Sequence, residues 1–486
     1  MLDVLINLFS VQLFSKIGTF FLNRFAANRD LSAFGACNFR YDLLFRSVVF
    51  LSREPLRRFS LRNASPAIRN HPAFSAVLWL ILPLSCITSI FLLVFNLFIR
   101  TDVLNFRIGL FITCFAAIIE CFSEPFFNLF QVSDVHFSRY NKFLSFSYLV
   151  KTFVSIILLH FTHDLALSFS IGYFLRSIFL LLSSLLIAFD YYSSPDFSLF
   201  FPFKEFSKIH VNPYFPLVKN FIVQTVLKFF MTETESSVLS WTLTSEQLGL
   251  FSIIQGISVF ITKFLFLPIE EYVFRLLQTS SASQHSVDVT LGLSRTVFFV
   301  GFAACVFVKP FSPLISKIFL PSTYSDSVVL VVEYFLLLPL FAMNGVSEAI
   351  FHATVAPDRL TRINIVYVVI TTIYVCLCVI FINLFGFLGL FVSIALNMIT
   401  RVLISIKFVS FLNLRRLLPK SFVLFTLVLC SFVVIYCDVL VPCSLSDLST
   451  NYFSVVSVVF LGLLCLFVFI VSERSFLRIF WSQKQE

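Results

Sequence analysis

Residues 73–98, AFSAVLWLILPLSCITSIFLLVFNLF, carry no charged side chain over their whole length. A helix needs about 20 consecutive, mostly apolar residues to cross the hydrocarbon core of a bilayer. This stretch is long enough, and it therefore predicts a membrane-spanning helix. Similar runs, separated by polar or proline-marked breaks, follow one another along the chain.

The composition excludes a soluble globular fold. Of the 486 residues, 58% are hydrophobic and 13% are charged, whereas about 25% of the residues in an ordinary soluble domain are charged. Fourteen spans would use roughly 280 residues and leave about 200 for connections, too few for a sizeable extramembrane domain. The 68 phenylalanines and only 12 glycines favour lipid-facing surfaces over a glycine-rich nucleotide-binding loop. The predicted fold class is an all-α polytopic membrane protein with about 14 transmembrane helices.

The apolar runs place these helices and divide the chain into lobes. The predicted spans are 4–25, 39–56, 73–98, 107–131, 143–161, 165–189, 216–242, 247–277, 294–320, 327–353, 363–384, 387–412, 420–440 and 453–472. The predicted parts are an N-terminal lobe of six helices (1–190), a cytosolic linker (191–215), a second six-helix lobe (216–412), helices 13 and 14 (413–472) and a tail (473–486).

Lysine and arginine are unevenly distributed between the two sets of loops. Loops after even-numbered spans, with the tail, hold twenty, and loops after odd-numbered spans hold seven. Because short cytosolic loops collect these residues, both termini are predicted to be cytosolic. This sorting also accounts for the net charge of +9, so no nucleic-acid partner is predicted. The sequon at Asn63 falls in a loop assigned to the cytosol and should be unused.

Two charge patterns recur in both halves of the chain. Arg46, Glu54 and Arg58 have the same spacing as Lys263, Glu271 and Arg275, 217 positions later. Ser123-Glu124, with Asp134 ten residues after the glutamate, recurs as Ser347-Glu348 with Asp358. The two patterns predict a pair of parallel six-helix repeats.

The remaining eight cations, not counted with the loops, are assigned to the apolar runs, namely Lys16, Arg46, Lys151, Arg176, Lys219, Lys228, Lys263 and Arg401. Left facing lipid, they would cost on the order of 20 kcal/mol, so they must face a cavity, pair with acids or reach the interface. Lys16 and Lys263 lie near the middle of their runs, which favours a cavity. Lys151 and Lys219 lie near the ends of theirs, which favours snorkelling.

Embedded acids are fewer, and Glu120, Glu233, Glu235, Glu271 and Glu348 are the clearest. Glu233 and Glu235 point about 200° apart on a helix, so a structural salt bridge suits them better than a shared site. Glu270 and Glu271 follow Pro268 near a cytosolic helix end. They either cap that end or form a gate with the basic cluster from Arg53 to Arg58, which includes Arg57.

Signatures of catalysis and of metal binding are absent from the sequence. It contains no phosphate-binding loop, GxSxG or HExxH motif and no CxxC pair. His160 and His163 beside Asp164 are better explained as a solvated loop-end cluster than as a metal site. We therefore expect a protein that is not an enzyme, without cofactor or metal. Cys437 and Cys443 flank one loop and could pair in an oxidising lumen.

Five blocks resemble the Rft-type proteins of the endoplasmic reticulum. They are LFRSVVFLSREPLRRFSL (44–61), IIECFSEPFFNLFQ (118–131), LPIEEYVFRLL (267–277), AMNGVSEAIFHA (342–353) and LNMITRVLIS (396–405). The resemblance runs over essentially the whole chain. It implies a role in moving the dolichol-diphosphate oligosaccharide precursor of N-glycans from the cytosolic to the lumenal leaflet, either as the flippase or as its accessory. It also implies the two-lobed architecture of the multidrug and oligosaccharidyl-lipid flippase superfamily.

The resemblance and the embedded charges together give candidate roles. A diphosphate needs cations in a hydrated cleft, while the prenyl tail stays in membrane lipid. The residues expected to meet the diphosphate are Lys16, Arg24, Arg46, Arg53 and Lys263. The residues expected to form a gate or an interlobe pairing are Arg57, Arg58, Glu270 and Glu271. The embedded polar residues expected to be structural are Glu124, Glu233, Glu348, Asn397 and Arg401.

Two other functions fit the architecture less well. A cation-coupled multidrug antiporter would need several acids deep in one lobe, but the embedded cations outnumber the clear embedded acids eight to five. A polyprenyl-phosphate sugar transferase would need a catalytic carboxylate on a large lumenal loop, but the loops after odd spans are short.

Overall fold

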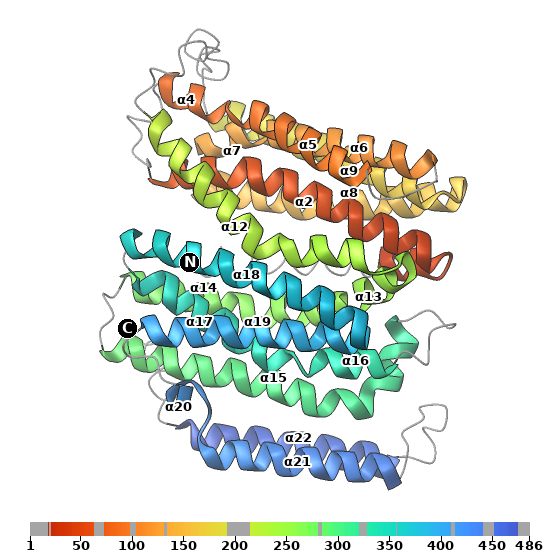
Figure 1. The fold of residues 1–486 in the computed structure, drawn as a ribbon, viewed down its shortest axis with the longest axis vertical. Helices are drawn as coiled ribbons and strands as arrows, with labels where there is room; N and C mark the ends of the chain where they lie inside the picture. The colour runs from red at the N-terminus through yellow and green to blue at the C-terminus, as the bar shows by residue number, and fades with distance from the viewer. Residues whose placement is uncertain are drawn as a thin grey trace. The chain divides into compact units, whose positions relative to one another are not determined.

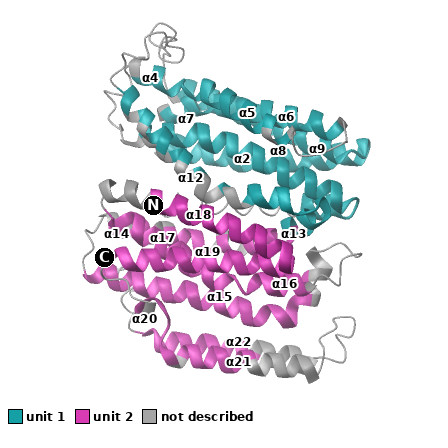
Figure 2. Cartoon of the chain, in the orientation of Figure 1, with its two compact units in different colours: residues 1–252 teal, residues 253–486 magenta. Residues whose placement is uncertain are grey.

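The structure is a computed structural model, and every regular element in the part of the chain that it describes is helical (Figure 1). It describes residues 18, 21–62, 72–97, 104–130, 134–191, 214–279, 284–319, 328–355, 357–409, 414–440 and 452–474. The chain forms two compact units, residues 1–252 and 253–486, which are coloured separately in Figure 2.

The first unit is built around the long helix α2. Its helices are α2 (Leu31–Arg62), α4 (Pro72–Leu78), α5 (Ile81–Leu97), α6 (Leu104–Phe122), α7 (Glu124–Phe130), α8 (Asp134–Thr162), α9 (Leu165–Tyr191) and α12 (Phe215–Thr242), followed by the start of α13 (Ser245–Ile261). Helix α2 packs against α5, α6 and α12, and α9 packs against both α6 and α8. The polar residues of α2 are therefore surrounded by neighbours from several helices.

The second unit repeats the all-helical construction. After α13 come a π-helical turn, η2 (Thr262–Phe266), and then α14 (Leu267–Thr279), α15 (Gln284–Phe319), α16 (Val328–Phe335), α17 (Leu338–Thr354), α18 (Pro357–Phe385), α19 (Phe387–Phe408), α20 (Leu414–Leu417), α21 (Ser421–Leu440) and α22 (Tyr452–Ser472). Helix α17 is central, because it packs against α14, α15 and α19.

The predicted fold class is confirmed. Among the described residues, eight helices are long and apolar enough to cross a bilayer. Each predicted span from 39–56 to 453–472 coincides with a helix or a pair of consecutive helices. Helix α2 is not among the eight, because it carries several arginines and acids. The predicted span 4–25 lies largely outside the described residues.

Four predicted spans are interrupted, and each interruption has the same sequence signal. In the four cases a proline lies within the first three residues of the second helix: Pro83 in α5, Pro125 in α7, Pro268 in α14 and Pro339 in α17. Proline has no N–H to donate and its ring clashes with the preceding turn, so it is favoured at the start of a helix. The four prolines therefore mark the breaks, although proline alone does not force one, because Pro55 lies inside the continuous α2.

Helices α8 and α9 approach closely at a glycine. A Cβ atom added at Gly172 would lie 2.1 Å from Ser155 Oγ and 3.2 Å from the carbonyl oxygen of Lys151. A larger side chain would require the Ser155 hydroxyl to turn away and the Lys151 backbone to shift slightly. The glycine thus permits the close approach of α9 to α8 beside Tyr173, which is fully buried.

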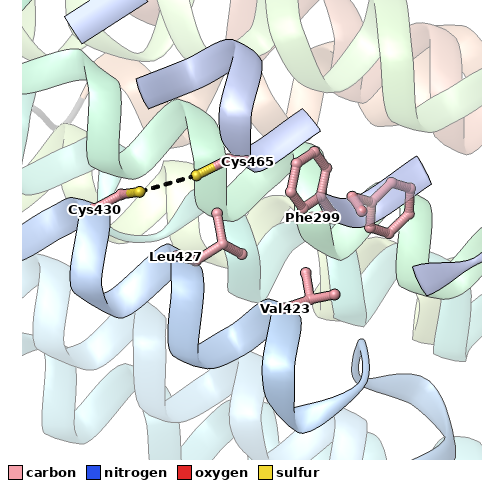
Figure 3. Packing of buried hydrophobic residues seen from close by; sticks show 6 residues of the cluster. Phe299, Val423, Leu427, Cys430 and Cys465 are labelled. Carbon is pink, nitrogen blue, oxygen red and sulfur yellow. Dashed lines mark hydrogen bonds between the residues drawn. The ribbon is translucent and has the colours of Figure 1, made fainter. Parts of the chain in front are cut away.

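The two C-terminal helices pack on α15 through a small apolar cluster (Figure 3). Val423, Leu427 and Cys430 of α21 meet Cys465 of α22 and Phe299 of α15. The Cys465 and Cys430 sulfur atoms lie 3.2 Å apart, as thiols in hydrogen-bond contact. The suggested pairing of Cys437 with Cys443 cannot be placed, because Cys443 and the side chain of Cys437 lie outside the described part.

Candidate functional site

A half-exposed ion pair lies near the middle of α2. The Arg46 Nε atom is 2.7 Å from Asp42 Oδ2, and the two residues are one helical turn apart. The exposed fractions of their side chains are 50% and 38%. Charged groups on a membrane-spanning helix are tolerated where they meet water or an opposite charge. Asp42 supplies that opposite charge to Arg46, and half of the Arg46 side chain stays accessible from outside the packed unit.

Two residues from neighbouring helices support the pair. The Tyr173 hydroxyl on α9 donates a hydrogen bond of 2.8 Å to Asp42 Oδ1. The Lys151 ammonium on α8 lies 3.6 Å from the centre of the Tyr173 ring, a cation–π contact. We call Asp42, Arg46, Lys151 and Tyr173 the Asp42–Arg46 cluster. It holds two cations, Arg46 and Lys151, and one carboxylate, Asp42.

Helix α12 brings a further carboxylate toward this cluster. Glu233 exerts an electrostatic attraction on the Arg46 guanidinium. Helix α12 is held against α2 near Arg40, whose Nη2 atom donates to the Ser240 carbonyl oxygen at 3.4 Å. Glu233 was predicted to be a structural embedded residue, and an electrostatic partner of Arg46 is compatible with that prediction.

A second charged cluster connects the C-terminal half of α2 with the break between α6 and α7. Arg57 donates two hydrogen bonds to Glu124, from Nε to Oε2 at 2.8 Å and from Nη2 to Oε1 at 2.6 Å. Arg53 Nη1 lies 3.7 Å from the same Oε1 atom. Glu124 is only 1% exposed. Its burial and two-pronged contact indicate a fixed element of the fold, positioned because α7 begins at this residue after the break at Ser123.

A third pair is buried inside the first unit. Arg176 Nη2 on α9 lies 3.3 Å from Glu120 Oε1 on α6, and both side chains are less than 10% exposed. The Arg176 guanidinium also covers the rings of Tyr148 and Phe45. This cation is paired and enclosed, so it is not available to a ligand.

In the second unit, Lys263 lies on the π-helical turn η2 between α13 and α14. The sequence predicts that this residue contacts the diphosphate. Pro268 lies four residues after Phe264. In a regular α-helix the proline ring would clash with the backbone carbonyl group of Phe264. The π turn is where the helix accommodates this conflict. Such turns occur frequently at functional sites. The Lys263 side chain is outside the described part of the structure.

The remaining predicted residues of the second unit gather around α17. Glu270 on α14 packs over Gly345, where an added Cβ would lie 1.8 Å from its carboxylate. Glu348 is 3.6 Å from His352 and 4.0 Å from Arg401. Asn397, on α19 one turn before Arg401, is buried.

The structure therefore brings some predicted residues together and leaves others undescribed. Arg46 has a carboxylate partner on its own helix, and Arg53 and Arg57 share Glu124. Arg24 is exposed on a helical segment before α2. Lys16 and the side chains of Arg58 and Glu271 lie outside the described residues, so the pairing of Arg57 and Arg58 with Glu270 and Glu271 stays a prediction.

Sequence reasoning missed Asp42 and Tyr173. The spacing of Asp42 and Arg46, four residues apart on a predicted helix, was a usable signal, because such residues lie one above the other. Tyr173 had no such signal, since it meets Asp42 only through the packing of α9. Lys151 was assigned to snorkelling, whereas the structure places its ammonium on the Tyr173 ring.

The fold and these charged clusters define a class: a multi-pass, all-helical membrane protein with paired and half-exposed cations in its membrane-spanning part. The Rft protein family model matches residues 3–483. The chain belongs to the Rft protein family.

Named relatives cover nearly the same length. The "Man(5)GlcNAc(2)-PP-dolichol translocation protein RFT1" of Dictyostelium discoideum is 25% identical, over 88% of this chain and 86% of that protein. The protein of the same name from Xenopus tropicalis is also 25% identical, over 89% and 87%. Among solved structures, "Lipid II flippase MurJ, inward closed conformation" matches with a TM-score of 0.63 and 17% identity, over 96% of this chain and 99% of that one. At this identity the likeness concerns the fold.

Proposed function

We propose that this chain moves a dolichol-diphosphate-linked oligosaccharide, the precursor of N-glycans, from the cytosolic to the lumenal leaflet of the endoplasmic reticulum membrane. Membership of the Rft family and the names of the two relatives support the choice of substrate. The likeness in fold to a protein named as a lipid II flippase supports transport rather than catalysis.

The observation that carries the proposal is the half-exposed Arg46 near the middle of α2. A diphosphate carries about two negative charges, which cannot enter hydrocarbon without counter-charges and water. Arg46 offers a planar guanidinium suited to phosphate oxygens. Arg53, 32% exposed beside Glu124, is the next cation along the same helix. The prenyl tail would remain in lipid while these cations escort the head group.

Transport would proceed by alternating access, with each unit moving largely as a rigid body. The π turn at Lys263 is a second candidate contact for the diphosphate, because the sequence repeat pairs Lys263 with Arg46. The antiporter alternative is less well supported. In the described part of the first unit, the buried carboxylates of Glu120 and Glu124 are both paired with arginines, so neither is placed to take up a transported cation.

The experiment that tests this function is complementation. Cells depleted of their own Rft-family protein would be supplied with this chain, and the occupancy of N-glycan sites on a secreted reporter would be measured. We expect restored occupancy and loss of the accumulated lipid-linked intermediate. Unchanged under-glycosylation, with the chain present in the membrane at normal level, would contradict the proposal.

The uneven distribution of cations makes a separate prediction about topology. We expect a glycosylation tag fused to the C-terminus to stay unmodified and the same tag placed in the 441–452 loop to be modified, because twenty cations against seven put the tail in the cytosol. The measurement is an endoglycosidase-sensitive mobility shift. A glycan on the tail, on Asn63, or none on the loop tag would reverse the orientation.

A further inference from the structure

The Asp42 carboxylate is held from two sides by groups on different helices. Its Oδ2 atom faces Arg46 Nε on α2 at 2.7 Å, and its Oδ1 atom accepts the Tyr173 hydroxyl of α9 at 2.8 Å. Tyr173 is 1% exposed, so its hydroxyl is directed at Asp42 from inside the packed unit. An ordinary surface pair at this spacing has no such buried support.

The Arg46 guanidinium can contact more than this carboxylate. A guanidinium has five N–H donors, and a single carboxylate occupies at most two of them in a two-pronged contact. Half of the Arg46 side chain is exposed. A second anion can therefore reach the guanidinium while Asp42 is still beside it. Glu233 of α12 also attracts the guanidinium, but Asp42 is the carboxylate in direct contact with it.

We infer that Asp42 is the resident counter-ion of Arg46, which holds the guanidinium in place before a diphosphate binds and then competes with the diphosphate for it. The inference rests on the proposed function. It adds a residue that sets how tightly, and for how long, the head group is held. Asp42 is a positioning residue in this scheme, because it acts on the substrate through Arg46.

The competition has a definite electrostatic sign. Asp42 attracts the same guanidinium that the phosphate would bind, and its own charge repels the phosphate. Removing the Asp42 charge should therefore strengthen diphosphate binding. A protein that carries a substrate across a membrane must also release it, and a bound state that is too stable slows this step. Asp42 would thus lower the affinity for the diphosphate and speed the release of the substrate.

Tyr173 should act in the opposite direction. Its hydroxyl stabilises the charged carboxylate of Asp42 independently of Arg46. Without that hydrogen bond, the Asp42 carboxylate binds Arg46 more strongly, and a diphosphate displaces it less readily. Loss of the Tyr173 hydroxyl should therefore weaken diphosphate binding. These opposite signs separate a competing counter-ion from a structural pair, since damage to a structural pair would not tighten binding.

The test uses the full-length purified protein in lipid nanodiscs, with farnesyl diphosphate as the probe and farnesol as the uncharged reference. We expect Asp42→Asn to lower the Kd for farnesyl diphosphate by about threefold to tenfold, and to lower the maximal translocation rate of a fluorescent dolichol-diphosphate oligosaccharide. Tyr173→Phe should raise the Kd by about twofold to threefold. Farnesol binding should change in neither variant.

Asp190→Asn is the matched control, because this exposed carboxylate pairs with Arg139 on the surface of the same unit. It should leave both measurements unchanged. Unchanged or weaker diphosphate binding in Asp42→Asn, with wild-type transport intact, would overturn the counter-ion inference alone. Should Asp42→Asn not fold, Tyr173→Phe decides, and an unchanged Kd there would likewise overturn it. If the wild-type protein neither binds the diphosphate nor moves the oligosaccharide, the proposed function fails and the inference falls with it.

Discussion

Replacing Arg46 by alanine should remove most of the transport activity while leaving the protein folded. Hydrogen bonds to charged groups contribute about 1.5–3 kcal/mol, which corresponds to a loss of roughly tenfold to a hundredfold. The fold should tolerate the change, because Arg46 is half exposed and Asp42 keeps its hydrogen bond from Tyr173. The measurement is restoration of N-glycan occupancy in depleted cells, normalised to the amount of the chain in the membrane.

Arg139→Ala is the matched control for this prediction. Arg139 is 49% exposed and forms an ion pair with Asp190, much as Arg46 does with Asp42, but it lies in the first two turns of α8. It should support normal glycosylation. Arg46→Lys should retain part of the activity. The positive charge remains, but an ammonium cannot make the two-pronged contact with phosphate that the planar guanidinium makes. Normal glycosylation by Arg46→Ala would remove Arg46 from the substrate path.

Replacing Glu124 by alanine should destabilise the first unit severely. Glu124 is 1% exposed and holds Arg57 through two hydrogen bonds, with Arg53 nearby. Removing one partner of a buried ion pair costs about 3–5 kcal/mol. The loss here should fall near the lower end of that range, because Arg57 and Arg53 are 26% and 32% exposed and keep some contact with solvent. The melting temperature of the detergent-solubilised protein and its steady-state level in the membrane should both fall.

The second unit supplies the control at the equivalent position of the sequence repeat. Glu348 is 36% exposed and its contacts with His352 and Arg401 are long, at 3.6 and 4.0 Å. Glu348→Ala should cost about 1 kcal/mol or less, as for other exposed pairs. Equal losses in the two variants would show that the Glu124 pairing does not stabilise the protein beyond an ordinary surface contact.

The fold could be predicted from the sequence because span-length apolar runs encode membrane helices directly. The runs did not reveal that 107–131 and 247–277 are interrupted, although Pro125 and Pro268 marked both places. The repeated Ser-Glu pattern also differs locally. Ser123-Glu124 lies at a helix break, whereas Ser347-Glu348 lies inside the continuous α17, where alanine follows in place of proline.

The charged clusters were only partly predictable. Arg46 could be selected because a cation in an apolar run must find water or a partner, and Arg53 could be selected through the family resemblance. Their partners could not be read in the same way. Glu120 and Arg176 are 56 positions apart, as are many pairs that never meet, and only the packing of α6 against α9 joins them. The two-pronged contact of Arg57 with Glu124 similarly depends on the α6–α7 break facing α2.

The proposed escort of a diphosphate head group by the cations of α2 is tested most directly in vesicles. Purified protein would be reconstituted with a fluorescent dolichol-diphosphate heptasaccharide, and the fraction of lipid protected from an external mannose-specific lectin would be followed over time. We predict that lipid exchanges between leaflets faster with the wild-type protein than in protein-free vesicles, and that Arg46→Ala slows this exchange at least tenfold. A wild-type rate equal to that of protein-free vesicles would contradict direct transport by this chain.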